Sequence, residues 1–335
     1  MSFKEYDEYD GLGLARLIEK KEVSPEELLL EAIERNERVN NKTNAVVLKH
    51  YDEAKNLIKR GLPKGPFTGV PYLLKDLHML FTGTKTTSGS KFFKDFVADH
   101  NSTLVERYLD SGLVIFGKTN TPEFGLTVTT EPKLYGPSRN PWNLDHSTGG
   151  SSGGAAAAVS SGVLPFANAS DGGGSIRIPA SCCGLFGLKP TRARTPMGPD
   201  RGEGWAGQSI SHCVSKSVRD SAALLDATTG LAPGDPYVAP STTMSFLDAC
   251  SKTPKGLKIA LDIPSEITSI DSEVEAAIKN TAKLCESLGH YVEEATPDVD
   301  TSALSEALGI IISANVTVAL DARAEFLGVQ VTEDV

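Results

Sequence analysis

Several features that often assign a protein to a class are scarce in this chain of 335 residues. It has only five cysteines, an odd number without C-x-x-C spacing, which argues against a disulfide framework and suits a reducing compartment. Positive charge is in deficit: the formal net charge is −10, so we expect neither nucleic acid nor an anionic membrane as a partner. Its six histidines show no H-x-x-x-H spacing, and we therefore expect no metal site.

Targeting and membrane-spanning segments are not indicated either. Residues 1–10 are acidic and polar, so we expect no signal peptide and a cytoplasmic protein. The longest apolar run, residues 307–320, is short and is interrupted by Ser313, Asn315 and Thr317. We therefore expect that no part of the chain spans a membrane.

What the chain does contain is typical of a globular α/β protein. Its residues are 40% hydrophobic and 23% charged, which is enough for a sizeable core. Ser24, Pro25 and Glu27 form a helix-start signal, with an N-capping serine and a proline at the first helical position. Short apolar runs alternate with helical patterns, which favours a mixed sheet between helices. Besides the helix after Ser24, helices are predicted at residues 51–59, 103–109, 155–163, 218–225, 272–288 and 302–326, and strands at 45–48, 70–74, 113–116, 165–169, 257–261 and 290–294.

The most distinctive stretch lies between Gly149 and Arg177. Residues 149–154 read GGSSGG and residues 170–177 read SDGGGSIR, with an alanine-rich segment and a short apolar run between them. Glycine lets the backbone take positive φ or approach another group closely, and successive N–H groups in such turns can converge on an anion. Two serine-bearing turns separated by a helix and a strand indicate a site rather than a flexible linker.

Other motifs accompany this stretch. They are GVPYLLKD at residues 69–76, GKTNTPE at 117–123, RNPW at 139–142, GLFGLKPT at 184–191 and, more weakly, SVRD at 217–220. In combination they are specific, and over roughly residues 24–240 the chain resembles the amidase signature family. It looks more like bacterial amidases that act on linear or cyclic amides, such as 6-aminohexanoate-cyclic-dimer hydrolases, than like the A-type component of glutaminyl-tRNA amidotransferases.

The resemblance implies the amidase-signature fold, an α/β architecture in which a twisted mixed β-sheet carries helices on both faces. We expect a single domain over residues 1–335, with an N-terminal helical region at 1–68, a catalytic core at 69–229 and further α/β elements at 230–335. Residues 230–243 are turn-rich and are the best candidate for a linker. Because family members usually run well past this length, we also expect that the domain lacks its C-terminal part and leaves an apolar helix face uncovered.

The resemblance also implies chemistry, namely hydrolysis of a carboxamide C–N bond through an acyl-enzyme. Ser175 is the implied nucleophile, Ser151 the bridging serine after a cis peptide bond, and Lys75 the base. A serine hydroxyl needs an adjacent base, and a lysine serves only where burial lowers its pKa toward neutrality. The apolar residues before Lys75 are consistent with such burial.

Further roles follow from the same resemblance. The implied oxyanion hole consists of the backbone N–H groups of Gly172, Gly173, Gly174 and Ser175. Many relatives have Thr or Ile where this chain has Gly172, a change that keeps the N–H group but alters loop stiffness. No metal or organic cofactor is implied, because the triad supplies nucleophile, relay and base. The supporting or substrate-binding residues are Ser152, Asp171 and Arg177.

Three motifs offer alternative sites. Residues 112–119 match the phosphate-binding pattern G-x-x-x-x-G-K-[ST], although the residues between the glycines are themselves predicted as a strand. Residues 149–153 match the nucleophile elbow G-x-S-x-G of α/β-hydrolase esterases. That elbow follows a buried strand, whereas residues 143–148 are polar and make a poor strand, and His212 or His290 would have to supply the base. Residues 88–91 match S-x-x-K, but no K-T-G follows.

Functions from other classes stay open at this point. The chain is alternatively the A-type component of a glutamine-dependent amidotransferase that works only in a complex, or a relative that binds without catalysis. Taken alone, Lys75 is better explained as a strand-end lysine that reaches solvent, and only the family resemblance links it to the two serine-bearing turns. We expect a small-molecule amide as the main partner and leave a homodimer open.

Overall fold

The computed structural model describes residues 3–263 and 269–332, and the chain divides into two compact units. The first unit comprises the chain up to residue 247 and again from residue 311, and the second comprises residues 248–310. All of the residues predicted to form the site belong to the first unit.

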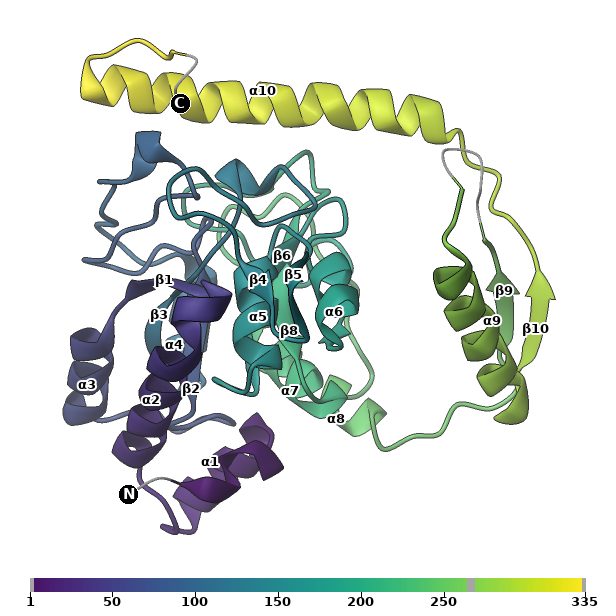
Figure 1. Ribbon diagram of the computed structural model, residues 1–335, viewed down its shortest axis with the longest axis horizontal. Coiled ribbons are helices and arrows are strands. Elements are labelled where there is room, and N and C mark those ends of the chain that lie inside the picture. The colour runs from purple at the N-terminus through teal and green to yellow at the C-terminus, as the bar shows by residue number, and fades with distance from the viewer. Residues whose placement is uncertain (1–2, 264–268, 333–335) are drawn as a thin grey trace. The chain divides into compact units, whose positions relative to one another are not determined.

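Helices form the beginning of the first unit (Figure 1). The Ser24 hydroxyl accepts a hydrogen bond from the Glu27 N–H, and the Glu27 carboxylate accepts one from the Ser24 N–H. This reciprocal capping box is the helix start that the sequence predicted. The helices are the short 3-10 helix η1 (Lys4–Glu8), α1 (Gly11–Glu19), α2 (Pro25–Thr43) and α3 (Tyr51–Arg60).

Two three-stranded sheets form the centre of the first unit. The first has the order β1 (Val46–Lys49), β3 (Val114–Thr119), β2 (Pro71–Lys75), with β2 parallel and β1 antiparallel to β3. The second has the order β6 (Phe166–Asp171), β8 (Ile210–Ser215), β7 (Phe186–Gly187), and both outer strands are antiparallel to β8. The Lys75 N–H donates to the Asn168 side-chain oxygen at 3.0 Å and so links the end of β2 to β6.

Successive residues of a strand point to opposite faces of the sheet, and helices cover both faces of these strands. Tyr72 and Leu74 of β2 pack in one core with residues of α4 and α7, whereas Leu73 packs in a second core with residues of α3 and α5. The α/β architecture with a mixed sheet is therefore confirmed. The remaining helices of this part are η2 (Lys91–Phe93), α4 (Thr103–Asp110), η3 (Glu123–Gly125), α5 (Gly153–Ser160), α6 (Arg177–Cys183), α7 (Val218–Thr228) and α8 (Phe246–Ala249).

The polar residues 143–148 differ from expectation, because most of them do form a strand. β4 (Arg139–Asn140) and β5 (Asn143–Ser147) pair as an antiparallel hairpin. Every residue of β5 is exposed, so the strand needs no apolar residues. It is not the buried strand that a nucleophile elbow requires.

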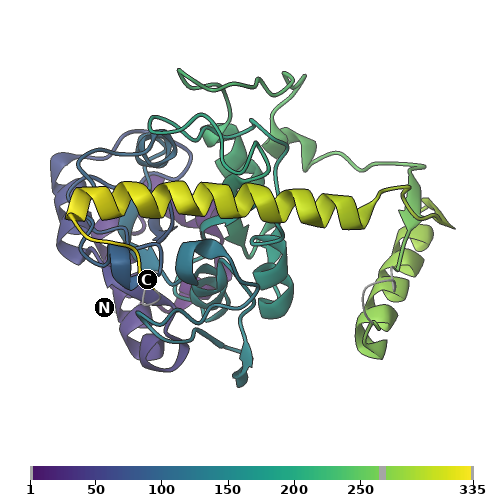
Figure 2. The same ribbon diagram turned by 90° about the horizontal axis from the view of Figure 1, so that it is seen from above.

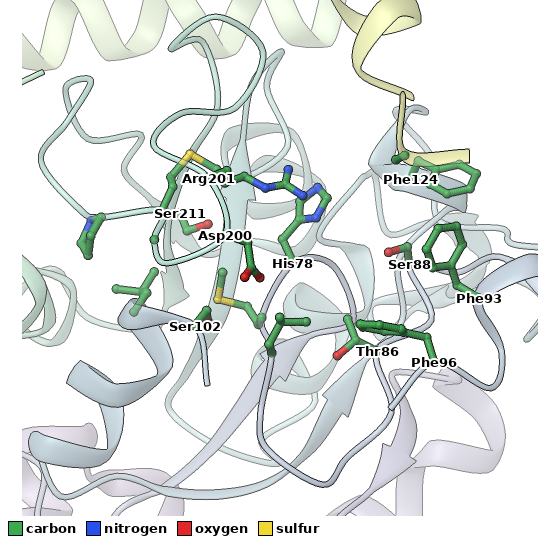
Figure 3. Close-up of a pocket in the computed structure, with 17 residues that line it drawn as sticks. His78, Thr86, Ser88, Phe93, Phe96, Ser102, Phe124, Asp200, Arg201 and Ser211 are labelled. Carbon is green, nitrogen blue, oxygen red and sulfur yellow. The ribbon is translucent and has the colours of Figure 1, made fainter. Parts of the chain in front are cut away.

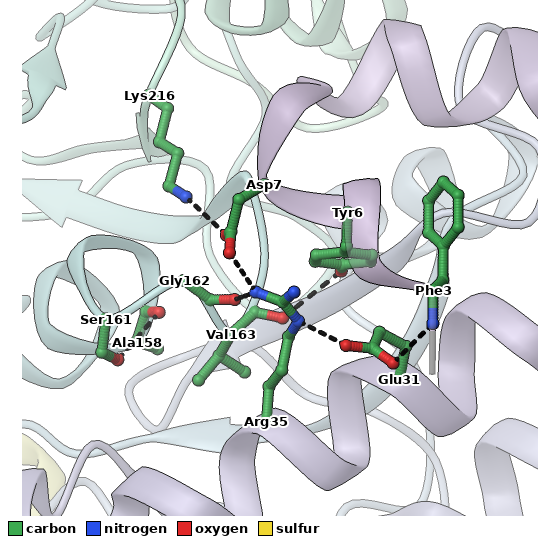
Figure 4. Close-up of polar contacts among 10 residues, drawn as sticks. All are labelled: Phe3, Tyr6, Asp7, Glu31, Arg35, Ala158, Ser161, Gly162, Val163 and Lys216. Atoms are coloured by element: carbon green, nitrogen blue, oxygen red, sulfur yellow. Dashed lines mark hydrogen bonds and ion pairs between the residues drawn. The ribbon is translucent and has the colours of Figure 1, made fainter. Parts of the chain in front are cut away.

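A buried arginine links η1 to α2 and to the turn after α5 through ion pairs and a hydrogen bond (Figure 4). Arg35, on α2, donates to the carboxylates of Glu31 at 2.7 Å and Asp7 at 2.6 Å. It also donates to the carbonyl oxygen of Gly162 at 3.1 Å, and its guanidinium lies 4.6 Å from the centroid of the Tyr6 ring. The side chains of Arg35 and Glu31 are only 8% and 5% exposed. Arg35 thus connects η1, α2 and the turn after α5, and Lys216 adds a second cationic partner for Asp7.

The second unit contains a small β-α-β arrangement. Strands β9 (Lys258–Leu261) and β10 (Tyr291–Glu294) are parallel, and α9 (Ser272–Ser287) lies between them in sequence. The Asp271 carboxylate accepts from the Glu273 N–H and caps α9. No residue of α9 is buried.

The last helix, α10 (Thr301–Leu327), is one long unbroken helix (Figures 1 and 2). Among the described residues it is the one helix that is long and apolar enough to cross a membrane by length and composition. Residues 307–320 were predicted to be too short to span a membrane, but they belong to a longer helix whose length does not support that prediction. Core helices of soluble proteins pass the same test, so the absence of a membrane partner stays a prediction.

Candidate active site

Lys75 ends strand β2 in the interior of the first unit. Its side chain is fully buried, and Nζ donates to the hydroxyl of Ser151 at 2.7 Å and to that of Ser170 at 3.0 Å. Burial lowers the pKa of Lys75 from 10.5 to about 7, against the opposing effect of the Asp171 carboxylate. A large fraction of Lys75 is therefore neutral near pH 7.

Ser151 lies on the turn between β5 and α5. The Gly150–Ser151 peptide bond is cis, as the resemblance implied. A Cβ atom at Gly150 would lie 2.6 Å from the carbonyl oxygen of Thr129, so only glycine fits there. The Thr130 hydroxyl donates to the carbonyl oxygen of Gly149 at 2.9 Å and holds the turn in place. Close backbone approach therefore explains part of the GGSSGG motif.

Asp171 shapes the turn that carries Ser175. Its carboxylate is fully buried and accepts from the N–H groups of Gly174 at 2.8 Å and Ile176 at 3.1 Å. The Arg177 guanidinium donates to both carboxylate oxygens, at 2.9 and 3.0 Å. Burial raises the pKa of Asp171, but the hydrogen bonds from Arg177 and from the backbone outweigh it and hold the pKa below its usual value. Both side chains are thus used to order the turn.

Ser175 lines the same cavity as Ser151 and Ser170. Among the residues that the structure describes, its hydroxyl has no hydrogen-bond partner, so it is not bonded to Ser151. The structure thus joins Lys75 to Ser151 by a hydrogen bond, and it places Ser175 on the wall of a cavity that Ser151 also lines. The Ser152 hydroxyl is not hydrogen-bonded to Lys75 and instead bonds the backbone of Ser170 at 3.3 Å.

One of the four predicted oxyanion donors is already used, since the Gly174 N–H donates to Asp171. In the described part of the chain, the N–H groups of Gly172, Gly173 and Ser175 have no acceptor. We therefore keep these three as candidate oxyanion donors and assign Gly174 to the turn.

Two residues on β6 belong to the site although they were not singled out from the sequence. Ser170 bonds Lys75 Nζ directly, and Asn168 accepts from the Lys75 backbone while its amide donates to the Tyr108 hydroxyl at 3.0 Å. Ser170 is part of the SDGGGSIR motif, but no spacing rule indicates that β6 lies against the end of β2.

The cavity at Ser175 is small, about 20 Å³, and it adjoins a larger one of about 180 Å³ (Figure 3). Aromatic and aliphatic side chains make up most of the larger cavity, among them Phe93 and Phe96. The residues that line both cavities are His78, Phe124, Met197 and Arg201.

Trp205 accounts for glycine at position 172. A Cβ atom at Gly172 would lie 2.6 Å from Cε3 and 2.7 Å from Cζ3 of the Trp205 indole. Both residues line the cavity at Ser175. A threonine or isoleucine at this position, as in many relatives, would require the indole to move.

The alternative motifs lack the surroundings that they would need. Lys118 is on the buried strand β3, and its Nζ donates to the carbonyl oxygen of Met79 at 3.0 Å, so it does not belong to a phosphate-binding loop. His212 is buried on β8 and bonds the Ser221 hydroxyl at 2.7 Å, not a serine of the GGSSGG turn. His290 belongs to the second unit. Within the described residues, no cluster of three or more His, Cys, Asp or Glu side chains is placed to hold a metal ion.

Sequence comparison finds one family and several relatives. Residues 27–335 match the family described as Amidase. The chain is 39% identical to 6-aminohexanoate-cyclic-dimer hydrolase of Paenarthrobacter ureafaciens and 40% identical to that of Pseudomonas sp. (strain NK87), in each case over 97% of this chain and 67% of the relative. It is 38% identical to the A-type component of the glutamyl-tRNA(Gln) amidotransferase of Halothermothrix orenii, over 86% of this chain and 60% of the relative.

Solved structures show the same likeness. The structure of 6-aminohexanoate cyclic dimer hydrolase complexed with substrate matches with a TM-score of 0.92 at 39% identity, over 97% of this chain and 69% of that one. A bacterial aryl acylamidase of the amidase signature family matches with a TM-score of 0.90 at 30% identity, again over 97% and 69%. This chain thus spans about two thirds of the length of these relatives.

Proposed function

The chain belongs to the amidase signature family of amide hydrolases, and on this premise we propose that it cleaves a small linear or cyclic carboxamide through an acyl-enzyme on Ser175. The observation that carries the proposal is the 2.7 Å hydrogen bond between Lys75 Nζ and the Ser151 hydroxyl, deep in the first unit and beside Ser175. A lysine with a pKa of 10.5 is neutral in only about one molecule in 3,000 at pH 7, whereas one with a pKa of about 7 is neutral in about half. Desolvation therefore supplies the base.

In the first half of the proposed reaction, the Ser175 oxygen attacks the carbonyl carbon of the amide. The Ser175 proton passes to Ser151, whose own proton passes to neutral Lys75. As the tetrahedral intermediate collapses, the proton returns through Ser151 to the amine nitrogen and the C–N bond breaks. The acyl group stays on Ser175 as an ester, and the amine leaves.

In the second half, a water molecule attacks the ester carbonyl and gives a proton to the same relay. The ester bond then breaks, Ser175 regains its proton through Ser151, and the acid is released. Negative charge develops on the carbonyl oxygen in both halves. The N–H groups of Gly172, Gly173 and Ser175 are the proposed donors to it, and losing one such donor typically costs about 3–4 kcal/mol.

Structural similarity favours a hydrolase of cyclic or linear amides over the A-type component of an amidotransferase. The hydrolase complexed with substrate matches with a TM-score of 0.92, and the A-type component of glutamyl-tRNA(Gln) amidotransferase from Thermotoga maritima matches with 0.74. Turnover of a simple amide by the purified protein alone supports the hydrolase. Turnover that is seen only in the presence of partner proteins supports the amidotransferase.

Covalent labelling tests the nucleophile. We expect a serine-reactive fluorophosphonate to add one adduct, mapped by peptide mass spectrometry to Ser175, and Ser175→Ala to abolish it. The matched control is Ser181→Ala, an exposed serine on the neighbouring helix α6, which should label like the parent protein. An adduct on Ser151 or Ser152, or one retained in Ser175→Ala, would refute the assignment and favour the nucleophile elbow.

A further inference from the structure

The larger cavity beside Ser175 contains polar groups that the proposed reaction does not use. Its wall is mainly apolar, yet it includes the Arg201 guanidinium and the Ser102 hydroxyl (Figure 3). Ser102 is 6% exposed, and its Oγ has no hydrogen-bond partner in the described part of the molecule. A buried hydroxyl without a partner is costly, so the cavity suits a ligand that brings polar atoms with it.

Arg201 differs from the other basic side chains near the site because, among the described residues, it has neither an ion pair nor a hydrogen bond. Arg177 is paired through both of its donors with Asp171, Lys75 bonds two serine hydroxyls, and Lys118 bonds Met79. For Arg201, no carboxylate of the described residues lies within ion-pair distance and no hydrogen bond is formed. As a whole residue Arg201 is exposed, but its guanidinium is partly desolvated, which lowers its pKa.

The groups around Arg201 leave it free to bind an anion. The adjacent Asp200 carboxylate bonds His100 Nε2 at 3.0 Å, so it already has a cationic partner when His100 is protonated. On the other side lies the His78 ring (Figure 3). Burial, together with the charges of Arg201 and Lys75, lowers the pKa of His78 to about 3, so this imidazole is neutral and does not compete for an anion.

Arg201 lines both the cavity at Ser175 and the larger apolar cavity. A chain whose amide lies at Ser175 and which extends into the larger cavity passes along Arg201. A guanidinium binds a carboxylate through two parallel hydrogen bonds, more strongly than it binds a neutral group.

We propose that Arg201 binds a carboxylate carried by the substrate, so that the preferred substrate is an amide whose apolar chain bears an acid group. This specificity rests on the amidase function proposed above. Arg201 lies outside the motifs from which the site was predicted.

Matched substrate pairs test the proposal. One pair carries the charge on the acyl part: the mono-p-nitroanilide of adipic acid against the p-nitroanilide of hexanoic acid. The other carries it on the amine part: N-hexanoyl-p-aminobenzoate against the anilide of hexanoic acid. We expect the ratio of kcat/KM, charged over neutral, to favour the acid in at least one pair. In Arg201→Met that ratio should fall about ten- to a hundredfold, the usual effect of losing a charged hydrogen bond.

Arg60→Met is the matched control, because it removes the same charge from an exposed position at the end of α3 and should keep the parent ratio. Arg201→Lys should recover part of the ratio, since it keeps the charge but not the paired donors. A ratio near one in both pairs, or one that Arg201→Met leaves unchanged, would overturn the proposal.

A binding measurement separates this proposal from the amidase function. The chain has two tryptophans, so in a Trp142→Phe, Ser175→Ala background the fluorescence reports Trp205 beside the nucleophile. We expect adipate to bind more tightly than hexanamide and Arg201→Met to weaken adipate binding about ten- to a hundredfold. Equal adipate affinity with and without Arg201 would refute the carboxylate site even if the amidase is active. Tight, Arg201-dependent binding would uphold it even if every amide above is left uncleaved.

Discussion

At the scale of single residues, the site depends on what surrounds Lys75 more than on the lysine itself. Its Nζ lies between two serine hydroxyls, and the apolar strand before it removes water. The Asp171 carboxylate raises the pKa of Lys75 and so opposes neutralisation, and Arg177 pairs with that carboxylate. The chain therefore keeps a base neutral by burial while it confines the neighbouring negative charge to an ion pair.

The pH dependence of turnover follows from this arrangement. Because burial lowers the pKa of Lys75 to about 7, the neutral, active fraction should grow as the pH rises through 7 and level off above 8. We expect log(kcat/KM) to show an ascending limb near pH 7, measured on a neutral amide. Lys75→Ala should lose far more than tenfold in kcat/KM, or more than about 1.4 kcal/mol of transition-state stabilisation.

Lys118→Met is the matched control for this limb. Lys118 is also buried and its pKa is lowered to about 8, but its Nζ bonds Met79 and Thr86 instead of the site serines. The limb should keep its position in that variant. A limb near pH 10 in the parent protein would show that burial does not lower the pKa of the base, and one that moves when Lys118 is replaced would contradict its assignment to Lys75.

At the scale of elements, the attachment of η1 to α2 depends on one buried ion cluster. Replacing Arg35 by methionine leaves the buried Glu31 carboxylate without its charged partner, with only the Phe3 N–H still donating to it. We expect this to lower the free energy of unfolding by about 3–5 kcal/mol, measured by urea denaturation. Lys49→Met, which removes an exposed ion pair with Glu37, should cost no more than about 1 kcal/mol.

A double variant separates loss of the charge pair from loss of packing. Arg35→Met combined with Glu31→Leu removes both charges, so the unpaired carboxylate no longer exists and much of the stability should return. If the double variant is as unstable as the sum of the two single variants, the cluster is not acting as a coupled ion pair.

Elements with a local signal were predictable from the sequence, and those without one were not. The α2 start was predicted because Ser24 and Glu27 cap it locally, and β2 because its residues are apolar. β8 was missed because it buries the polar residues Ser211, His212 and Ser215. The Ser221 hydroxyl that bonds His212 Nε2 lies on α7 and reaches it only in the folded chain. The burial of β8 is decided by tertiary contacts.

The same limit applies to the candidate site. The motifs around Lys75, Ser151 and Ser175 identified the family, but nothing in their spacing brings Lys75 onto Ser151. That contact depends on the packing of β2 against β6 and α5, which also adds Ser170. Arg201 lies in a loop without a motif, and only its position in the fold connects it to the nucleophile.

At the scale of the whole molecule, the two compact units differ in how deeply their elements are buried. In the first unit, every residue of β3 and of β8 is buried. In the second, α9 has no buried residue, and β9 and β10 have none either. A short two-stranded sheet with an exposed helix is marginally stable, because little apolar surface is removed from water.

Native-state hydrogen exchange should therefore divide the chain along this boundary. We expect amides of residues 272–287, 258–261 and 291–294 to exchange at least about a hundredfold faster than those of β3, β6 and β8, as measured by mass spectrometry of peptides.

The same leucine-to-alanine substitution in each unit gives a matched test of stability. Leu73→Ala, at a fully buried position, should lower the free energy of unfolding by about 2–5 kcal/mol, whereas Leu284→Ala, at a position 58% exposed, should change it by less than about 0.5 kcal/mol. Equal hydrogen-exchange protection in the two units, or a loss of about 2 kcal/mol in the free energy of unfolding from Leu284→Ala, would contradict this prediction. Either result would mean that α9 is buried by other residues and that the second unit is as stable as the first.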